Sequence, residues 1–94
     1  MNMGRKASRL QITIKEILGT GKCSQGFKVG DTWLIEDGLT PANFCMSALG
    51  SIYGTISTMR YGGEFPWGDP DVTSVGCPDF HNTVVYEIRR LPPK

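Results

Sequence analysis

Apolar and polar residues alternate along two long stretches of the chain, which is the pattern of strands with one buried face. The first begins at residues 10–15 and extends to Ile17 or Leu18, where the phase of the alternation slips. The second covers residues 83–91. Its core-facing positions are Val84, Tyr86 and Ile88, with Glu87 and Arg89 pointing outward.

Two shorter runs predict two further strands. Residues 32–36 are rich in β-forming side chains, and Asp37-Gly38 ends them with a strong turn signal. Residues 72–75 predict a short strand that ends at glycine. The chain therefore predicts four strands.

A helix is predicted between the second and third strands, over residues 41–59, because apolar residues recur there at helical spacing. Thr40 resembles an N-cap and Pro41 a first helical residue. Gly50 and Gly54 lie four apart, which either permits a close backbone approach or only weakens the helix. The recurring positions are Cys45, Leu49, Ile52, Ile56 and Met59.

The order β-β-α-β-β predicts an α+β fold, a small antiparallel sheet with one helix packed on a face. With 94 residues the chain is long enough for one domain. We expect a flexible basic tail over residues 1–9, the domain over residues 10–91 and a short tail over residues 92–94.

Composition excludes several classes of protein. Hydrophobic residues make up 39% of the chain and charged residues 20%, which argues against disorder. No apolar run is long enough to span a bilayer, and the first residues lack the apolar stretch of a secretory leader. The sequence therefore predicts a cytoplasmic protein without a membrane partner.

The net charge of +1 conceals a basic start, with Arg5, Lys6 and Arg9 in the first nine residues. The remainder carries seven basic residues against nine acidic ones and is slightly acidic. A nucleic-acid-binding domain usually shows a basic face, so nucleic acid is not expected as a partner. A protein partner or a homo-oligomer remains open.

Three cysteines stand at informative positions along the chain. Cys23 follows a glycine-rich turn, Cys45 lies in the first turns of the predicted helix, and Cys77 ends a strand. An odd number cannot form a complete set of intramolecular disulfides, and cytoplasmic thiols stay reduced. The thiols are therefore buried core residues, reactive groups or metal ligands.

His81, the one histidine, follows Cys77 by four positions and offers a fourth ligand. Together with the three thiols it would complete a tetrahedral zinc site. The other hypothesis for a metal site is an iron–sulfur cluster bound by the three thiolates, with an open fourth position. No Cys-x-x-Cys knuckle is present, and a turn residue near a loop tip is the ordinary role of such a histidine.

Two further features of the sequence have alternative interpretations. Cys77 could act as a nucleophile with His81 as base and Asp79 as orienting group, although three residues on one tight loop seldom point at one another. Phe65 and Trp67, in a loop of prolines and glycines, favour a core plug over an exposed contact patch.

A set of short motifs follows the same order as in a known group of proteins. They are Gly21-Lys22-Cys23, Phe27-Lys28-Val29-Gly30-Asp31, Phe44-Cys45, Gly62-Gly63-Glu64-Phe65-Pro66-Trp67, Asp69-Pro70-Asp71 and Cys77-Pro78-Asp79. In these motifs the chain resembles a small family of prokaryotic conserved-hypothetical proteins of about its own length. The resemblance covers nearly all of the chain after the basic start. It implies a shared role for the three thiols, and it gives His81 no regular counterpart.

The sequence thus favours a small metal- or iron–sulfur-binding module or accessory subunit. Its ligands would be Cys23, Cys45 and Cys77, with His81 as the fourth candidate and zinc or an iron–sulfur cluster as the cofactor. One alternative is a non-catalytic interaction or structural module with buried cysteines. The other is a cysteine-dependent enzyme that uses Cys77.

Overall fold

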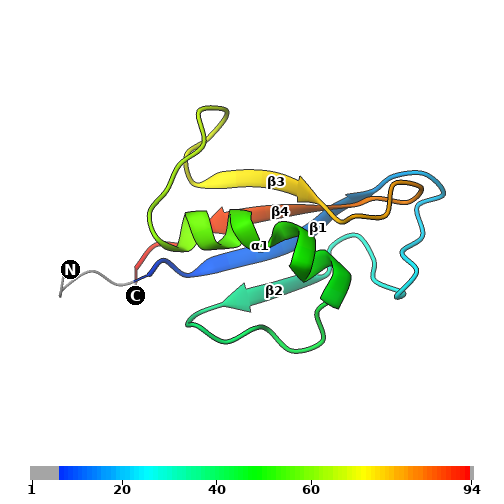
Figure 1. Ribbon diagram of the computed structural model, residues 1–94, viewed down its shortest axis with the longest axis horizontal. Coiled ribbons are helices and arrows are strands. Elements are labelled where there is room, and N and C mark those ends of the chain that lie inside the picture. Colours follow the sequence, from blue (N-terminus) through cyan, green and yellow to red (C-terminus); the bar gives the residue numbers. More distant parts are fainter. Residues whose placement is uncertain (1–6, 94) are drawn as a thin grey trace.

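The computed structural model describes residues 7–93, which form a four-stranded antiparallel sheet with one helix on a face (Figure 1). The predicted α+β fold is confirmed. Residues 1–6 of the predicted basic tail lie outside the described residues. The elements are β1 (Leu10–Ile17), β2 (Thr32–Ile35), α1 (Met46–Arg60), β3 (Val72–Gly76) and β4 (Val84–Arg90), and the strand order in the sheet is β2-β1-β4-β3.

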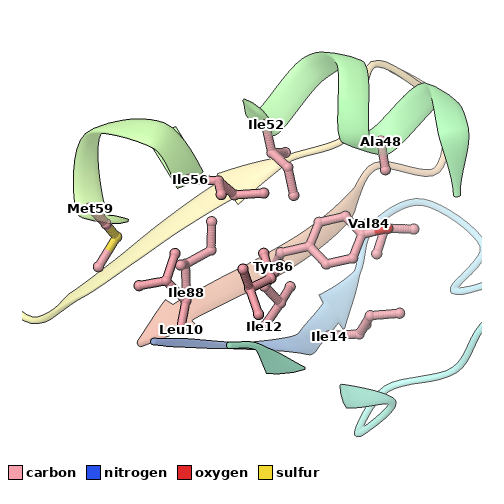
Figure 2. Close-up of a cluster of buried hydrophobic side chains, with 11 residues drawn as sticks. Leu10, Ile12, Ile14, Ala48, Ile52, Ile56, Met59, Val84, Tyr86 and Ile88 are labelled. Carbon is pink, nitrogen blue, oxygen red and sulfur yellow. The ribbon is translucent and has the colours of Figure 1, made fainter. Parts of the chain in front are cut away.

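The core lies between α1 and the face of the sheet made by alternate residues of the two central strands (Figure 2). The predicted orientation of β4 is confirmed, because Glu87 lies on the opposite face and pairs there with Lys15 at 3.2 Å and Arg89 at 3.3 Å. The buried side chains are Leu10, Ile12, Ile14, Ile35, Ala48, Ile52, Ile56, Met59, Val84, Tyr86 and Ile88.

The slip in the alternation of β1 is a β-bulge. Ile14 pairs with Tyr86, and the next pair along the ladder joins Glu16 to Val85, so that Lys15 is the extra residue. An extra residue reverses the side-chain alternation beyond it. Ile17 therefore returns to the buried face and packs against the core.

The helix begins five residues later than predicted, at Met46, with Cys45 as its N-cap. The prediction that Thr40 caps the helix and that Pro41 begins it is wrong. Asn43 has a φ of 58°, in the left-handed region, and a residue in that conformation cannot continue a helix. The rest of the prediction holds, since the sheet-facing side of α1 carries apolar residues.

Residues 7–93 contain no helix with the length and apolar character that crossing a bilayer requires.

Arg90 fixes the end of α1 that lies over the end of β4. Its Nε donates to the Met59 carbonyl at 3.2 Å, and its Nη1 donates to the Pro70 carbonyl and the Asp71 carboxylate at 3.3 and 3.1 Å. Its Nη2 donates to the Gly63 carbonyl. A cation is favourable at a helix C-terminus. One guanidinium thus joins β4, the helix end and the loop between α1 and β3.

The loop aromatics differ in their burial. Phe65 is half-buried and packs against the core, whereas Trp67 is 61% exposed. The two rings are stacked, with centroids 5.1 Å apart. The prediction that these side chains fill the core is therefore right for Phe65 and wrong for Trp67. The Trp67 indole covers one face of the Phe65 ring from the outside.

Replacing Gly54 by alanine should stabilise the protein. A Cβ at Gly50 or Gly54 would meet no atom within 4 Å, so neither glycine permits a close approach within the described residues. Each helical glycine costs about 1 kcal/mol relative to alanine. We expect urea unfolding of Gly54→Ala, and of Gly50→Ala as its matched partner, to show a gain of about that size. A loss would mean that another molecule packs on this side of α1.

Candidate thiol site

Three separated segments bring the cysteines to one cavity of about 270 Å³. The cavity is lined by Val84, which pairs with Ile17 at the end of β1, so it lies at the opposite end of the sheet from Arg90, which pairs with Leu10. Cys23, Cys45 and Cys77 are all half-buried free thiols. The other residues that line the cavity are Ser24, Gln25, Ser47, Ala48, Pro78, Asp79, Asn82, Val84 and Tyr86.

A cluster of four aromatic rings holds two of the cysteine-bearing segments on the sheet. The Trp33 ring lies 5.3 Å from Phe27 and 4.8 Å from Phe44, in edge-to-face contacts. Phe44 lies 5.4 Å from Tyr86. Such pairs contribute about 0.5–1.5 kcal/mol beyond the area they bury. Phe27 is four residues after the first cysteine and Phe44 directly precedes the second, so the cluster positions both thiols.

A second set of contacts ties the first cysteine loop to the β3–β4 hairpin. The backbone N–H and the hydroxyl of Thr20 both donate to Asn82 Oδ1, at 2.8 and 2.9 Å. Gly19 has a φ of 71°, and a Cβ there would overlap the carbonyl oxygen of His81. Only glycine fits this close backbone approach. The contact fixes the segment before Cys23 relative to the segment after Cys77.

Each cysteine lies close to a source of positive partial charge, which is a backbone N–H at two of the sulfurs and the helix N-terminus at the third residue. The Gln25 N–H donates to Cys23 Sγ at 3.4 Å, and the Val84 N–H donates to Cys77 Sγ at 3.2 Å. Cys45 is the N-cap of α1, and its side chain makes no capping hydrogen bond. A helix N-terminus carries the positive end of the macrodipole. Backbone N–H groups thus donate to two of the three sulfurs.

Tyr86 closes the cavity from the core side and is 1% exposed. Burial raises the pKa of its phenol, and the nearby thiols Cys45, Cys77 and Cys23 raise that pKa further. The phenol therefore keeps its proton at neutral pH. Tyr86, like Ala48 and Val84, belongs to both the hydrophobic core and the lining of the thiol cavity.

His81 does not join the three thiols. Its side chain is exposed, its ring lies 4.1 Å from the ring of Phe80, and it is absent from the described residues that line the cavity. Asp79 Oδ1 accepts the backbone N–H groups of His81 and Asn82, at 2.9 and 3.1 Å. The carboxylate thus shapes the turn, and the arrangement of Cys77, Asp79 and His81 as nucleophile, orienting group and base does not form.

The spacing of the thiols does not suit a single ion. Within residues 7–93 no three histidine, cysteine, aspartate or glutamate side chains are close enough to hold one metal ion between them. A zinc–thiolate bond is about 2.3 Å long, so three sulfurs on one zinc are nearly in contact. What the three thiols share is the lining of the cavity.

Neither the aromatic cluster nor the place of Tyr86 at the cavity could be predicted from the sequence. For Tyr86, the available signal was the position of the residue on the predicted core face. A buried hydroxyl there requires a hydrogen-bonding partner. Trp33 and Phe44 were identifiable as apolar residues from the sequence. The contact between their rings depends on the pairing of β2 with β1.

Comparisons with family models, curated proteins and solved structures gave no match. The case for the site therefore rests on its geometry.

Replacing Gly19 by alanine should displace the loop that carries Cys23. The new Cβ would overlap the backbone at His81, and alanine disfavours the positive φ. We expect a loss of about 1–3 kcal/mol in the free energy of unfolding. Chemical denaturation measures it, with Gly26→Ala as the control. Gly26 also has a positive φ but no atom within 4 Å of the added Cβ, and an equal loss in both variants would show that the contact at His81 contributes nothing.

The turn at Asp79 should loosen in acid. Hydrogen bonds from the Asn82 and His81 N–H groups lower the pKa of Asp79 below 3.8. The folded pKa is thus below the unfolded one, so the stabilisation is present above pH 3.8 and is lost as the pH falls through the folded value. We expect the amide NMR shifts of His81 and Asn82 to change together as the pH falls below about 4. Asp79→Asn, which keeps the acceptor oxygen, should retain the turn better than Asp79→Ala.

Proposed function

We propose that the protein is a small metal-binding module that holds an iron–sulfur cluster on the thiolates of Cys23, Cys45 and Cys77. The observation that carries the proposal is the single cavity that all three thiols line. Iron–sulfur clusters are held by cysteine thiolates, and hydrogen bonds to the sulfurs tune them. The N–H donors at two of the sulfurs and the helix N-terminus at the third suit that role.

A cluster fits this cavity better than a single zinc ion. The volume of about 270 Å³ exceeds the 150 Å³ or so of a cavity that binds benzene. Bridging sulfides let thiolates bind that lie too far apart to share one ion. With three protein thiolates, the fourth position of the cluster is open to a ligand from outside the chain.

The apolar side chains beside the cavity support the role of an accessory subunit. Met46 and Phe80 are both 85% exposed, and each is the sequence neighbour of a cavity-lining residue. Exposed apolar groups around a functional site are typical of protein–protein contacts. A partner that meets this end of the molecule would cover the open position of the cluster.

The two other hypotheses have less support. All three thiols pack against the apolar core, but each is only half-buried and also lines a partly polar cavity. An enzyme using Cys77 would need a base beside the thiol, and His81 is turned toward Phe80. The resemblance to a prokaryotic three-cysteine family stays a prediction that agrees with the proposed ligands.

Anaerobic reconstitution with ferrous iron and sulfide tests the proposal. We expect iron and acid-labile sulfide to bind in equal amounts, with visible absorbance and an electron paramagnetic resonance signal after reduction. Cys23→Ser, Cys45→Ser and Cys77→Ser should each abolish most of the bound iron, because each removes one of three protein ligands.

His81→Ala is the matched control and should keep full iron occupancy, because its side chain lies outside the cavity lining. Circular dichroism establishes that each variant is folded. Binding of one zinc per chain and no iron would replace the cluster with a mononuclear site. A folded protein that binds neither metal would contradict the proposal and leave the interaction module as the better hypothesis.

A further inference from the structure

A groove separate from the thiol cavity, which we call the Arg60 groove, lies between α1 and the segment that follows β2. Its volume is about 50 Å³, and it shares no lining residue with the thiol cavity. One wall is residues 37–41, next to Ile35 at the end of β2. The other wall is one side of α1, since residues three and four apart on a helix are neighbours. The residues on that side are Leu49, Tyr53, Ile56, Ser57 and Arg60.

The surface of the Arg60 groove is mostly apolar. Its apolar side chains are Ile35, Leu39, Pro41, Leu49 and Ile56. One water needs roughly 10–15 Å³ of such a volume, so the groove takes roughly four groups of that size. Water would find few polar partners here, and a short aliphatic chain suits the walls better. Leu39 is 75% exposed, so such an occupant would also remove apolar surface from water.

The polar group that points to a ligand is the guanidinium of Arg60. Its Nε is buried, and no acceptor for its hydrogen is found within residues 7–93. Leaving a buried, charged donor unpaired is costly. Nη1, on the side of the guanidinium away from the Nε–H, donates to the Tyr61 hydroxyl at 3.4 Å, and the Tyr61 ring centre lies 5.2 Å from the guanidinium carbon. These contacts orient the guanidinium, and the edge that includes Nε is one that binds a carboxylate through two parallel hydrogen bonds.

The neighbouring charges do not compete for this edge. Asp37, the other charged residue of the lining, shapes the turn after β2, where its Oδ1 accepts the Leu39 N–H at 2.8 Å. Within the described residues no ion pair joins Asp37 to Arg60. The C-terminus of a helix carries partial negative charge, which disfavours an anion. Here the Met59 carbonyl already accepts a hydrogen bond from Arg90 Nε at 3.2 Å, so a second cation offsets that charge.

We propose that the Arg60 groove binds a small monocarboxylic acid with an aliphatic chain of about four carbons. The carboxylate pairs with the Nε edge of Arg60, which turns toward the groove on binding, and the chain lies against Leu39 and Ile56. This pairing supplies the acceptor that the buried Nε–H lacks, and the volume of the groove limits the length of the chain. The inference goes beyond the proposed function and does not depend on it, because the two sites share no residue.

A titration of the ¹⁵N-labelled full chain with isovalerate, followed by NMR, tests the inference. We expect the Arg60 Nε–H resonance and the backbone amides of residues 37–40 to shift together and to saturate. A dissociation constant in the millimolar range is expected of a ligand with so few atoms. Isovaleramide has the same chain without the charge and should leave the Nε–H resonance in place. Equal shifts with the amide and the acid would overturn the inference, because the chain alone would then be recognised.

Substitutions at Arg60 separate its charge from its geometry. Arg60→Gln should weaken isovalerate binding about tenfold, because it removes hydrogen bonds to a charged group. Arg89→Gln is the matched control and should bind like the wild type, because Arg89 is half exposed and lies outside the groove lining. Arg60→Lys keeps the charge but loses the paired donors, so its affinity should fall between the two. Leu39→Ala should weaken binding several-fold and still show the Nε–H shift at saturation.

The NMR spectrum of each variant also establishes that it is folded, and Arg60→Lys serves the comparison if Arg60→Gln does not fold. No saturable shift in the wild type, or an unchanged dissociation constant in the Arg60 variants, would overturn this inference and leave the proposed function intact. A chain that binds isovalerate as expected and takes up no iron would overturn the proposed function alone.

Discussion

The structure depends on burying one face of a sheet under a helix that is too short to cover it. α1 has 15 residues and is about 22 Å long, whereas β1 alone has eight residues and extends over about 27 Å. Arg90 holds the C-terminal end of the helix at one end of the sheet. The other end is completed by aromatic rings and loops, and the thiol cavity is the space they leave.

The elements with regular patterns could be predicted from the sequence. The alternation in β1 and β4 indicated their buried faces. The slip in phase that was predicted at Ile17 or Leu18 is explained by the bulge at Lys15, which was not predicted from the sequence. The helix start could not be found in this way. Thr40 and Pro41 have the residue types of a cap, but capping depends on backbone geometry, and Asn43 in the left-handed region moves the start to Met46.

The candidate site shows a different limit of sequence reasoning. The position of the cysteines at junctions between elements was informative, because junctions at one end of an antiparallel sheet meet in space. Proximity in sequence was misleading for His81, which is close to Cys77 along the chain and yet lies outside the cavity lining. The backbone donors to sulfur from Gln25 and Val84 exist only in the folded loops, so no pattern of residue types could have indicated them.

The strand order also constrains how the protein folds. β1 and β4 are the central pair, with Leu10 opposite Arg90, so the middle of the sheet forms only when distant parts of the chain meet. Closing such a loop is entropically costly, and proteins dominated by long-range pairing fold slowly. β4 contributes both the Val84 amide and Tyr86 to the cavity. Because β4 supplies part of the lining, the cavity forms only when β4 has paired with β1.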